Sequence, residues 1–279
     1  MSTIAEALRE ATAKLTGAGI DSARLDARLL LGAALGVGGT WLFNHANDEL
    51  RDTVAFASLI QRRLNREPIS LILGSREFWS LDFTVTRDTL APRPDSETLI
   101  EAVLAEVPDR QRPLSLLDLG TGTGCLLLAL LSELPNARGT GVDANPATLA
   151  VAKGNAERLG FSARTDFILS DWWQRVEGQF DIILSNPPYI PSGDIPGLDP
   201  EVAAFEPLGA LDGGTDGLDA YRLLAGGAGR FLAEDGVIAF EVGAGQAGDV
   251  ADLLKQAGFV VRGIRRDLAG IERCVVAGR

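Results

Sequence analysis

The spacing of apolar residues separates an N-terminal helical part from the rest of the chain. Leucines recur at helical spacing through residues 1–74, which predicts a small all-helical bundle. Asp21 and Ser22 precede an amphipathic stretch as capping residues do, and Asp48 is expected to open a helix that runs to about Arg66. This part carries no cluster of catalytic residue types, so we interpret it as a packing or substrate-recognition module.

A different pattern follows the bundle. Residues 75–91 mix apolar and polar side chains in a roughly alternating order, with Asp82 available for a turn. This pattern predicts a β-hairpin that links two domains. Pro92 and Pro94 then stiffen the backbone before a helix that is expected to begin near Asp95.

The remaining residues, 92–279, are typical of an α/β domain in which apolar strands alternate with helices. We expect strands at 114–119, 138–143, 165–169, 180–185, 236–242, 259–265 and 272–278, and helices near 124–133, 146–159, 218–231 and 246–256. This order predicts a mainly parallel, Rossmann-like sheet with helices on both faces. No helix separates the last two strands, so one of them is expected to be antiparallel.

Composition and charge exclude several classes of function. A chain of 279 residues suggests roughly two domains. The net charge is −12, whereas proteins that bind duplex DNA usually present a basic face. Two cysteines and one histidine provide neither a disulfide framework nor an ordinary zinc site. No apolar run approaches the ~18 residues of a membrane span, and the N-terminus lacks the basic start of a signal peptide. We therefore expect a cytoplasmic protein without metal or membrane contact.

A glycine-rich loop follows the first strand of the α/β domain. Its residues are Gly120, Thr121, Gly122, Thr123 and Gly124. Glycines let the backbone turn sharply and let a ligand approach closely at this edge of a parallel sheet. The spacing differs from the G-x-G-x-x-G of dinucleotide-binding enzymes. We expect this loop to bind a cofactor and the preceding Asp118 to organise it.

Acidic and aromatic residues follow the next two strands. Asp143 can accept hydrogen bonds from both hydroxyls of a ribose; the alternative is a helix cap, since Asn145-Pro146 begins the next helix. Asp171 can accept a hydrogen bond from an adenine amino group. We expect Trp172 to pack on the adenine ring and Trp173 to belong to the core.

The tetrad Asn186-Pro187-Pro188-Tyr189 directly follows the fourth strand. Two prolines after a strand fix an extended backbone and remove two donors. The side-chain oxygen of Asn186 and the carbonyl of Pro187 remain as acceptors, and such a pair can hold both hydrogens of a planar NH2 group. Tyr189 offers a surface against which a flat amide or base can rest. The alternative is a proline-ended strand with a packing tyrosine.

Together, these motifs resemble a known family. The glycine loop, Asp143 and the tetrad resemble S-adenosylmethionine-dependent methyltransferases of the seven-stranded fold that modify planar nitrogens. Three further segments resemble the release factor glutamine methyltransferases (PrmC/HemK): Arg76-Glu77-Phe78-Trp79-Ser80-Leu81, Pro92-Arg93-Pro94-Asp95-Ser96-Glu97 and Phe205-Glu206-Pro207-Leu208. The resemblance runs from about Glu67 to the C-terminus, and the helical part also fits. Ala91 and Ser96 depart from it, since a larger aliphatic residue and Thr are usual there.

The resemblance implies a cofactor, a substrate and residue roles. S-adenosylmethionine would contact Gly120 to Gly124, Asp143, Trp172 and Asn186. The residues from Asn186 to Tyr189 would hold the glutamine in the Gly-Gly-Gln loop of bacterial peptide chain release factors 1 and 2, in support of translation termination. Arg93 either guides the substrate loop or pairs with an acid of this chain. Glu206 either braces the tetrad or is a solvated or salt-bridged carboxylate.

Three other classes of function stay open on the residues alone. An amino-directed DNA methyltransferase shares the tetrad but needs a target-reading module and phosphate contacts, which the near-neutral bundle and the acidic remainder of the chain do not favour. A nicotinamide oxidoreductase shares the ribose-binding acid but neither the glycine spacing nor the tetrad. A non-catalytic S-adenosylmethionine-binding protein differs from an enzyme only in turnover.

Overall fold

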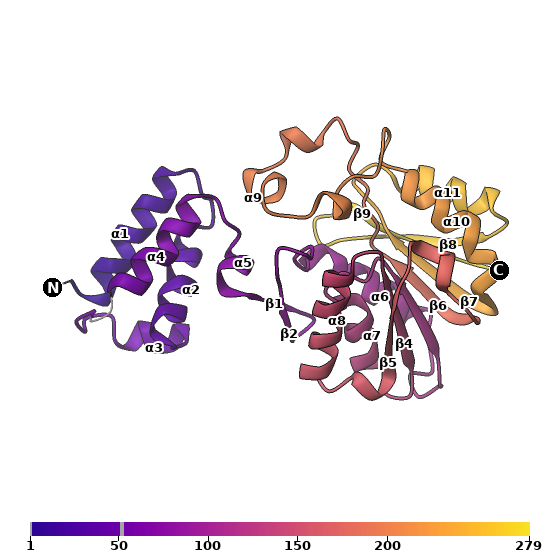
Figure 1. The fold of residues 1–279 in the computed structure, drawn as a ribbon, viewed down its shortest axis with the longest axis horizontal. Coiled ribbons are helices and arrows are strands. Elements are labelled where there is room, and N and C mark those ends of the chain that lie inside the picture. Colours follow the sequence, from indigo (N-terminus) through magenta and orange to yellow (C-terminus); the bar gives the residue numbers. More distant parts are fainter. Residues whose placement is uncertain (1, 51–52) are drawn as a thin grey trace. The chain divides into compact units, whose positions relative to one another are not determined.

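The computed structural model describes residues 2–50 and 53–279 (Figure 1) and divides the chain into two compact units. The first unit contains Met1–Gly74 together with Asp199–Phe205, and the second contains Ser75–Leu198 and Glu206–Arg279. The chain therefore leaves the second unit for one short segment and then returns to it.

The first unit is built from helices. They are α1 (Ile4–Gly17), α2 (Ala23–Leu35), α3 (Gly39–Asn44), α4 (Thr53–Leu64), α5 (Ile69–Leu73) and α9 (Pro200–Ala203). A capping box begins α1: Glu6 N donates to Thr3 Oγ1 at 3.2 Å, and Thr3 N donates to Glu6 Oε2 at 2.9 Å. Two amides at the helix start are thereby satisfied. Leu15, Leu30 and Phe56 are among the buried side chains through which α1, α2 and α4 pack together.

Two helix starts differ from the sequence-based predictions. Ser22 precedes α2, but its hydroxyl donates to Asp26 Oδ2 at 2.9 Å and caps no backbone amide. The cause is that Asp26 is a buried acid that requires donors. The helix expected from Asp48 begins at Thr53, because Glu49 forms a β-bridge with the residue that precedes α1.

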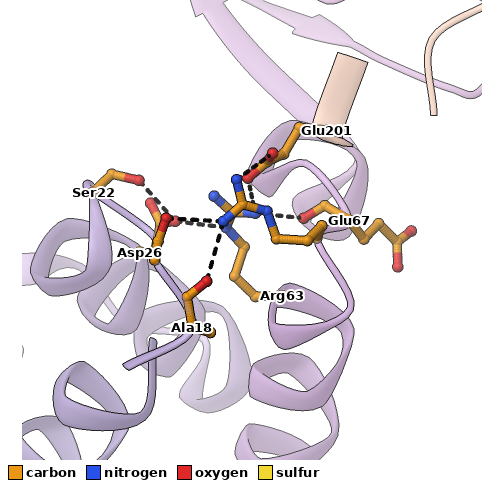
Figure 2. A network of polar contacts seen from close by, with 8 residues as sticks. Ala18, Ser22, Asp26, Arg63, Glu67 and Glu201 are labelled. Carbon is orange, nitrogen blue, oxygen red and sulfur yellow. Dashed lines mark hydrogen bonds and ion pairs between the residues drawn. The ribbon is translucent and has the colours of Figure 1, made fainter. Parts of the chain in front are cut away.

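Buried ion pairs tie the segment Asp199–Phe205 to helices α2 and α4 (Figure 2). Arg63 Nε donates to Asp26 Oδ2 at 2.7 Å, and Arg63 Nη1 donates to Glu201 Oε1 at 2.9 Å. Arg66 Nη2 donates to the other oxygen of Glu201 at 2.8 Å. The side chains of Arg63 and Asp26 are 7% and 2% exposed. Because an unpaired charge at such burial is strongly destabilising, these groups hold one another in place.

The second unit contains a seven-stranded sheet in the order β5-β4-β3-β6-β7-β9-β8. Its strands are β3 (Ser115–Leu119), β4 (Arg138–Asp143), β5 (Thr165–Leu169), β6 (Phe180–Ser185), β7 (Leu232–Glu241), β8 (Val260–Arg266) and β9 (Glu272–Gly278). The strands from β3 to β7 pair in parallel, and β9 is antiparallel to both β7 and β8. The prediction of an antiparallel strand at the end of the chain is confirmed. β7 begins before its expected start because Leu232 already pairs with Phe180.

Helices cover both faces of this sheet (Figure 1). They are α6 (Glu97–Ala105), α7 (Cys125–Glu133), α8 (Pro146–Arg158), α10 (Asp219–Phe231) and α11 (Ala247–Gln256), with short 3-10 helices η1 (Pro94–Ser96), η2 (Ser162–Arg164), η3 (Trp172–Arg175), η4 (Ile195–Gly197) and η5 (Leu208–Ala210). Leu116 and Ile182 belong to one core with α6 and α7, whereas Leu117 and Ile183 belong to another with α10 and α11. Successive strand residues point to opposite faces. The predicted α/β fold is confirmed.

The predicted hairpin consists of β1 (Ser75–Phe78) and β2 (Leu81–Thr84) and belongs to the second unit. Its turn lies at Trp79 and Ser80, which have φ values of 51° and 58°, and not at Asp82, which lies on β2. Trp79 N donates to Glu97 Oε1 at 3.1 Å, and Trp79 Nε1 donates to Glu133 Oε1 at 2.9 Å. These two bonds stabilise the unusual turn and hold the hairpin against α6 and α7.

Candidate functional site

A cavity of about 420 Å³ lies at the carboxyl edge of the parallel strands, entirely within the second unit. This volume lies in the range of about 300–1,000 Å³ that small-molecule and cofactor sites occupy. Of the residues selected from the sequence, the cavity lining includes Arg93, Gly120, Thr121, Gly122, Thr123, Asp143, Asp171, Trp172, Asn186 and Pro188. Gly124, Pro187 and Tyr189 belong to the same loops but are not lining residues. The topology therefore brings together residues from five separate segments.

The glycine loop adopts a backbone that favours glycine. Gly120, Gly122 and Gly124 have φ values of 73°, 56° and 81°, in the left-handed region that other residues rarely adopt. The amides of Gly120 and Thr121 both donate to Val142 O at 2.9 Å, which fixes the loop to the end of β4. The loop backbone thereby lies open to a ligand at the start of α7.

Asp118 is fully buried beneath this loop. Thr121 Oγ1 donates to Asp118 Oδ2 at 2.6 Å, in accord with the expected role in organising the loop. The other oxygen, Oδ1, has no hydrogen-bond partner among the described residues. Burial raises the pKa of Asp118 to about 7, and the negative charge of Asp143 adds to this effect, while the bond from Thr121 opposes it.

Asp143 ends β4 beside the glycine loop. Its Oδ2 accepts from Gly122 N at 3.2 Å and its Oδ1 accepts from Asn145 N at 3.0 Å. Asn145 itself caps α8, because its side chain accepts from Ala147 N at 2.9 Å. Burial raises the pKa of Asp143, although the backbone amides oppose the shift. The carboxylate thus lines the cavity while a different residue caps the helix.

The two adjacent tryptophans have different surroundings. Trp172 lines the cavity, and its ring lies against the position that a Cβ at Gly120 would occupy, at 3.7 Å. Trp173 stacks on Phe231 with ring centroids 5.0 Å apart, and its Nε1 donates to Leu223 O at 3.0 Å. The segment is a 3-10 helix, in which one tryptophan faces the cavity and the other packs against the core.

The tetrad lies at the end of β6, next to the glycine loop. Asn186 lines the cavity, and its Nδ2 donates to Ser96 Oγ at 3.4 Å. Tyr189 is held through its backbone, because Gln246 Nε2 donates to Tyr189 O at 2.9 Å. Burial raises the pKa of Tyr189, and the negative charge of Glu241 adds to this effect.

Arg93 and Glu206 form a close ion pair at the rim of the cavity. Arg93 Nη2 donates to both oxygens of Glu206 at 2.7 Å. The side chain of Glu206 is only 4% exposed, whereas that of Arg93 is 43% exposed. Burial raises the pKa of Glu206 and the charge of Arg93 opposes the shift. Of the two alternatives for each residue, the structure supports pairing within the chain.

Three polar residues near the tetrad did not emerge from the sequence analysis as site residues: Ser96, Glu241 and Gln246. Glu241 is 3% exposed at the end of β7, where it follows an apolar strand much as Asn186 follows β6. A charged residue at the carboxyl end of a predicted parallel strand was the signal that could have identified it.

Searches for metal and membrane features gave negative results within the described residues. No group of three or more His, Cys, Asp or Glu side chains in residues 2–50 and 53–279 is arranged to hold a metal ion. None of the helices described for the chain is long and apolar enough to cross a membrane.

Comparisons with known proteins match both parts of the chain. Residues 6–74 match the model of the PrmC N-terminal domain, and residues 95–195 match that of the methyltransferase small domain. A release factor glutamine methyltransferase of Rhodospirillum rubrum is 49% identical over 95% of this chain and 82% of its own length. One from Bradyrhizobium diazoefficiens is 46% identical over 99% of this chain and 94% of its own length.

The chain belongs to the release factor glutamine methyltransferase family. It is accordingly an S-adenosylmethionine-dependent protein-(glutamine-N5) methyltransferase. The fold is also that of a methyltransferase of Pyrococcus furiosus, with a TM-score of 0.53 at 18% identity over 80% of this chain and 100% of the other.

The residues of the cavity fit S-adenosylmethionine. The loop of positive-φ glycines leaves room for a ligand against its backbone. Asp143 supplies a carboxylate at the place where nucleotide-binding sheets hold a ribose. Trp172 adds an aromatic ring to the cavity lining, which fits a flat adenine ring.

Proposed function

We propose that this protein methylates the side-chain amide nitrogen (N5) of the glutamine in the Gly-Gly-Gln motif of peptide chain release factors 1 and 2. The modification would support translation termination and place the enzyme in the cytoplasm, where these factors act. The observation that carries the proposal is that Asn186 and Pro188 line the same cavity as the glycine loop and Asp143. A planar amide held by the tetrad would therefore lie next to the bound cofactor.

The cofactor-binding roles follow from the cavity lining. Asp143 would accept hydrogen bonds from the ribose hydroxyls, and the segment from Gly120 to Gly124 would contact the cofactor through its backbone. Trp172 would pack on the adenine ring, and Asp171 would accept from its amino group. Asp171 Oδ2 already accepts from Gln174 Nε2 at 2.7 Å, which holds the carboxylate in place.

The chemical task is to make a weak nucleophile react. The lone pair of an amide nitrogen is delocalised into its carbonyl, so this nitrogen must be aligned with the methyl group, and alignment alone can be worth several powers of ten in rate. S-adenosylmethionine supplies that methyl group on an electron-poor sulfonium. Asn186 Oδ1 and Pro187 O would each accept one N–H of the substrate amide, and Tyr189 would support its flat face.

The same acceptors would act during the transfer itself. Positive charge develops on the nitrogen as the new bond forms, and two oxygens directed at its hydrogens stabilise that charge. The nitrogen afterwards loses one proton, which can leave to water. This chain therefore needs no dedicated general base.

The helical unit would recognise the release factor, and Arg93 would serve the substrate loop indirectly. Because Arg93 already donates to both oxygens of Glu206, it would shape the rim of the cavity more than bind the glutamine itself.

Peptide mass spectrometry on a purified release factor tests the proposal. After incubation with this protein and S-adenosylmethionine, we expect one added methyl group on the Gly-Gly-Gln glutamine. The Asn186→Ala variant should not form this product. Its affinity for S-adenosylmethionine should stay within a few-fold of that of the unsubstituted protein. Asn136→Ala is the matched control, because Asn136 is exposed and does not line the cavity.

Other outcomes identify the alternatives. Cofactor binding without methylation of either release factor would refute the proposed substrate. Transfer of the methyl group to DNA in a parallel assay would indicate an amino-directed DNA methyltransferase. Full activity of Asn186→Ala would refute the role of the tetrad.

A further inference from the structure

The ends of β6 and β7 bring a buried carboxylate beside Asn186. These two strands are parallel neighbours, and Ser185 pairs with Phe240. Asn186 directly follows the last residue of β6, and Glu241 is the last residue of β7. Adjacent parallel strands keep their register at this edge of the sheet, so the two side chains leave the sheet at the same level.

Polar contacts join these side chains to Ser96. The side chains of Ser96 and Asn186 lie close enough to the carboxylate of Glu241 to oppose the rise of its pKa, and Asn186 Nδ2 donates to Ser96 Oγ at 3.4 Å. One oxygen of Glu241, Oε2, is buried with no hydrogen-bond partner among the described residues. The carboxylate therefore keeps unused acceptor capacity beside the Asn186 amide.

A carboxylate in this place determines which way the Asn186 amide is turned. An ionised carboxylate only accepts hydrogen bonds, whereas the asparagine amide has a donor end, Nδ2, and an acceptor end, Oδ1. The favourable arrangement directs Nδ2 at Glu241 and Ser96. Oδ1 is then the end that Asn186 can present to a substrate NH2 group, which requires an acceptor.

Hydrogen bonds from neighbouring residues fix the backbone of Glu241 and of the tetrad. Tyr221 Oη donates to the backbone carbonyl of Glu241 at 2.7 Å and is itself fully buried. Gln246 Nε2 donates to Tyr189 O at 2.9 Å, and Gly243 N donates to Gln246 Oε1 at 3.0 Å. The last residue of β7 thus lies beside the first residue of the tetrad, and Gln246, which follows β7, contacts the last.

We propose that Glu241 is a positioning residue for methyl transfer: it holds Nδ2 of Asn186 so that Oδ1 faces the substrate amide. This inference rests on the role proposed above for Asn186. Glu241 touches neither substrate nor cofactor, so it affects the rate only through the orientation of Asn186.

Steady-state kinetics with a release factor tests Glu241. Glu241→Met removes the acceptor from a side chain of similar length, and we expect kcat to fall on the order of 100-fold, as for a misplaced reacting group. Its KM for S-adenosylmethionine should stay within about twofold, because Glu241 does not line the cofactor cavity. Glu241→Gln keeps one acceptor oxygen and should recover kcat to within about tenfold of the unsubstituted enzyme.

Two more variants separate the possible failures. Ser96→Ala removes the other partner of Nδ2 and should lower kcat at an unchanged KM for S-adenosylmethionine; it decides the question if Glu241→Met does not fold. If Glu241→Met folds and its kcat is unaltered, the positioning role is overturned. If Glu241→Met does not fold, an unaltered kcat of folded Ser96→Ala overturns it. Asn186→Ala in the same assay tests the role of the tetrad: if it alone loses activity, only the inference on Glu241 fails.

Discussion

Arg63 and Glu201 are 138 residues apart in the sequence, yet Arg63 Nη1 donates to Glu201 Oε1 at 2.9 Å. Arg63 lies on α4, and Glu201 lies on α9 in the stretch of chain between the tetrad and α10. Side chains of the helical unit therefore anchor a segment whose two ends continue into the methyltransferase unit. The anchor depends on charge, because Glu201 is the shared partner of Arg63 and Arg66.

Glu201→Ala should release this segment and destabilise the helical unit. The substitution leaves Arg63 with Asp26 and the backbone carbonyl of Glu67 and removes one partner of Arg66, so we expect the free energy of unfolding to fall by about 1–3 kcal/mol. Urea unfolding gives this value, and limited proteolysis should show faster cleavage within 199–205. Glu177→Ala, at an exposed position of the other unit, is the control. Equal stability of the two variants would contradict the anchoring role.

Adjacent glycines on α10 should respond in opposite directions to alanine. A Cβ at Gly226 meets nothing within 4 Å, so Gly226→Ala should raise the free energy of unfolding by about 0.5–1 kcal/mol through helix propensity. A Cβ at Gly227 would lie 2.3 Å from Trp173 Nε1, so Gly227→Ala must displace Trp173 and should lower the free energy by about 1–3 kcal/mol. Thermal melts of both variants check the signs, and stabilisation by Gly227→Ala would show that Trp173 is not tightly packed.

The buried Asp118 predicts that stability depends on pH. Burial raises its pKa from 3.8 to about 7, so between these pH values the folded protein holds a proton that the unfolded chain has lost. The free energy of unfolding should therefore decrease as the pH rises through this interval, with the contribution fully present below about pH 4 and lost above about pH 7. Glu241, whose pKa burial also raises to about 7, acts in the same direction.

Asp118→Asn isolates this contribution. The amide oxygen can still accept from Thr121, but position 118 no longer titrates, so urea unfolding across the interval should show a smaller slope. Asp166→Asn, at an exposed position on β5, should keep the full slope. The explanation fails if Asp118→Asn has the slope of the unsubstituted protein.

The strands and the place of the site could be predicted because each depends on a local pattern. Short apolar runs specify buried parallel strands, and parallel strands bring the residues after them to one edge of the sheet. The glycine loop, Asp143, Trp172 and Asn186 all follow such strands and line one cavity. The order of the strands in space was not needed to name these residues.

The remaining features depend on contacts between distant segments. The hairpin turns at Trp79 and Ser80, two residues that do not favour positive φ, because bonds from Trp79 to α6 and α7 stabilise the turn. The proximity of Glu241 to Asn186 requires the pairing of β6 with β7, and no local pattern shows which two strands are neighbours. The link from Glu201 to Arg63 joins residues that are 138 positions apart and has no sequence signal at all.

Asp143→Asn should weaken S-adenosylmethionine binding with little effect on folding. A ribose hydroxyl gains about 1.5–3 kcal/mol from a charged acceptor, so replacing the carboxylate by an amide should raise the Kd at least about tenfold. The side-chain oxygen of Asn can still accept from Gly122 N or Asn145 N, which preserves part of the loop. Isothermal titration calorimetry gives the Kd, with Asp166→Asn again as the control. An unchanged Kd for Asp143→Asn would show that Asp143 only fixes the glycine loop and does not bind the ribose.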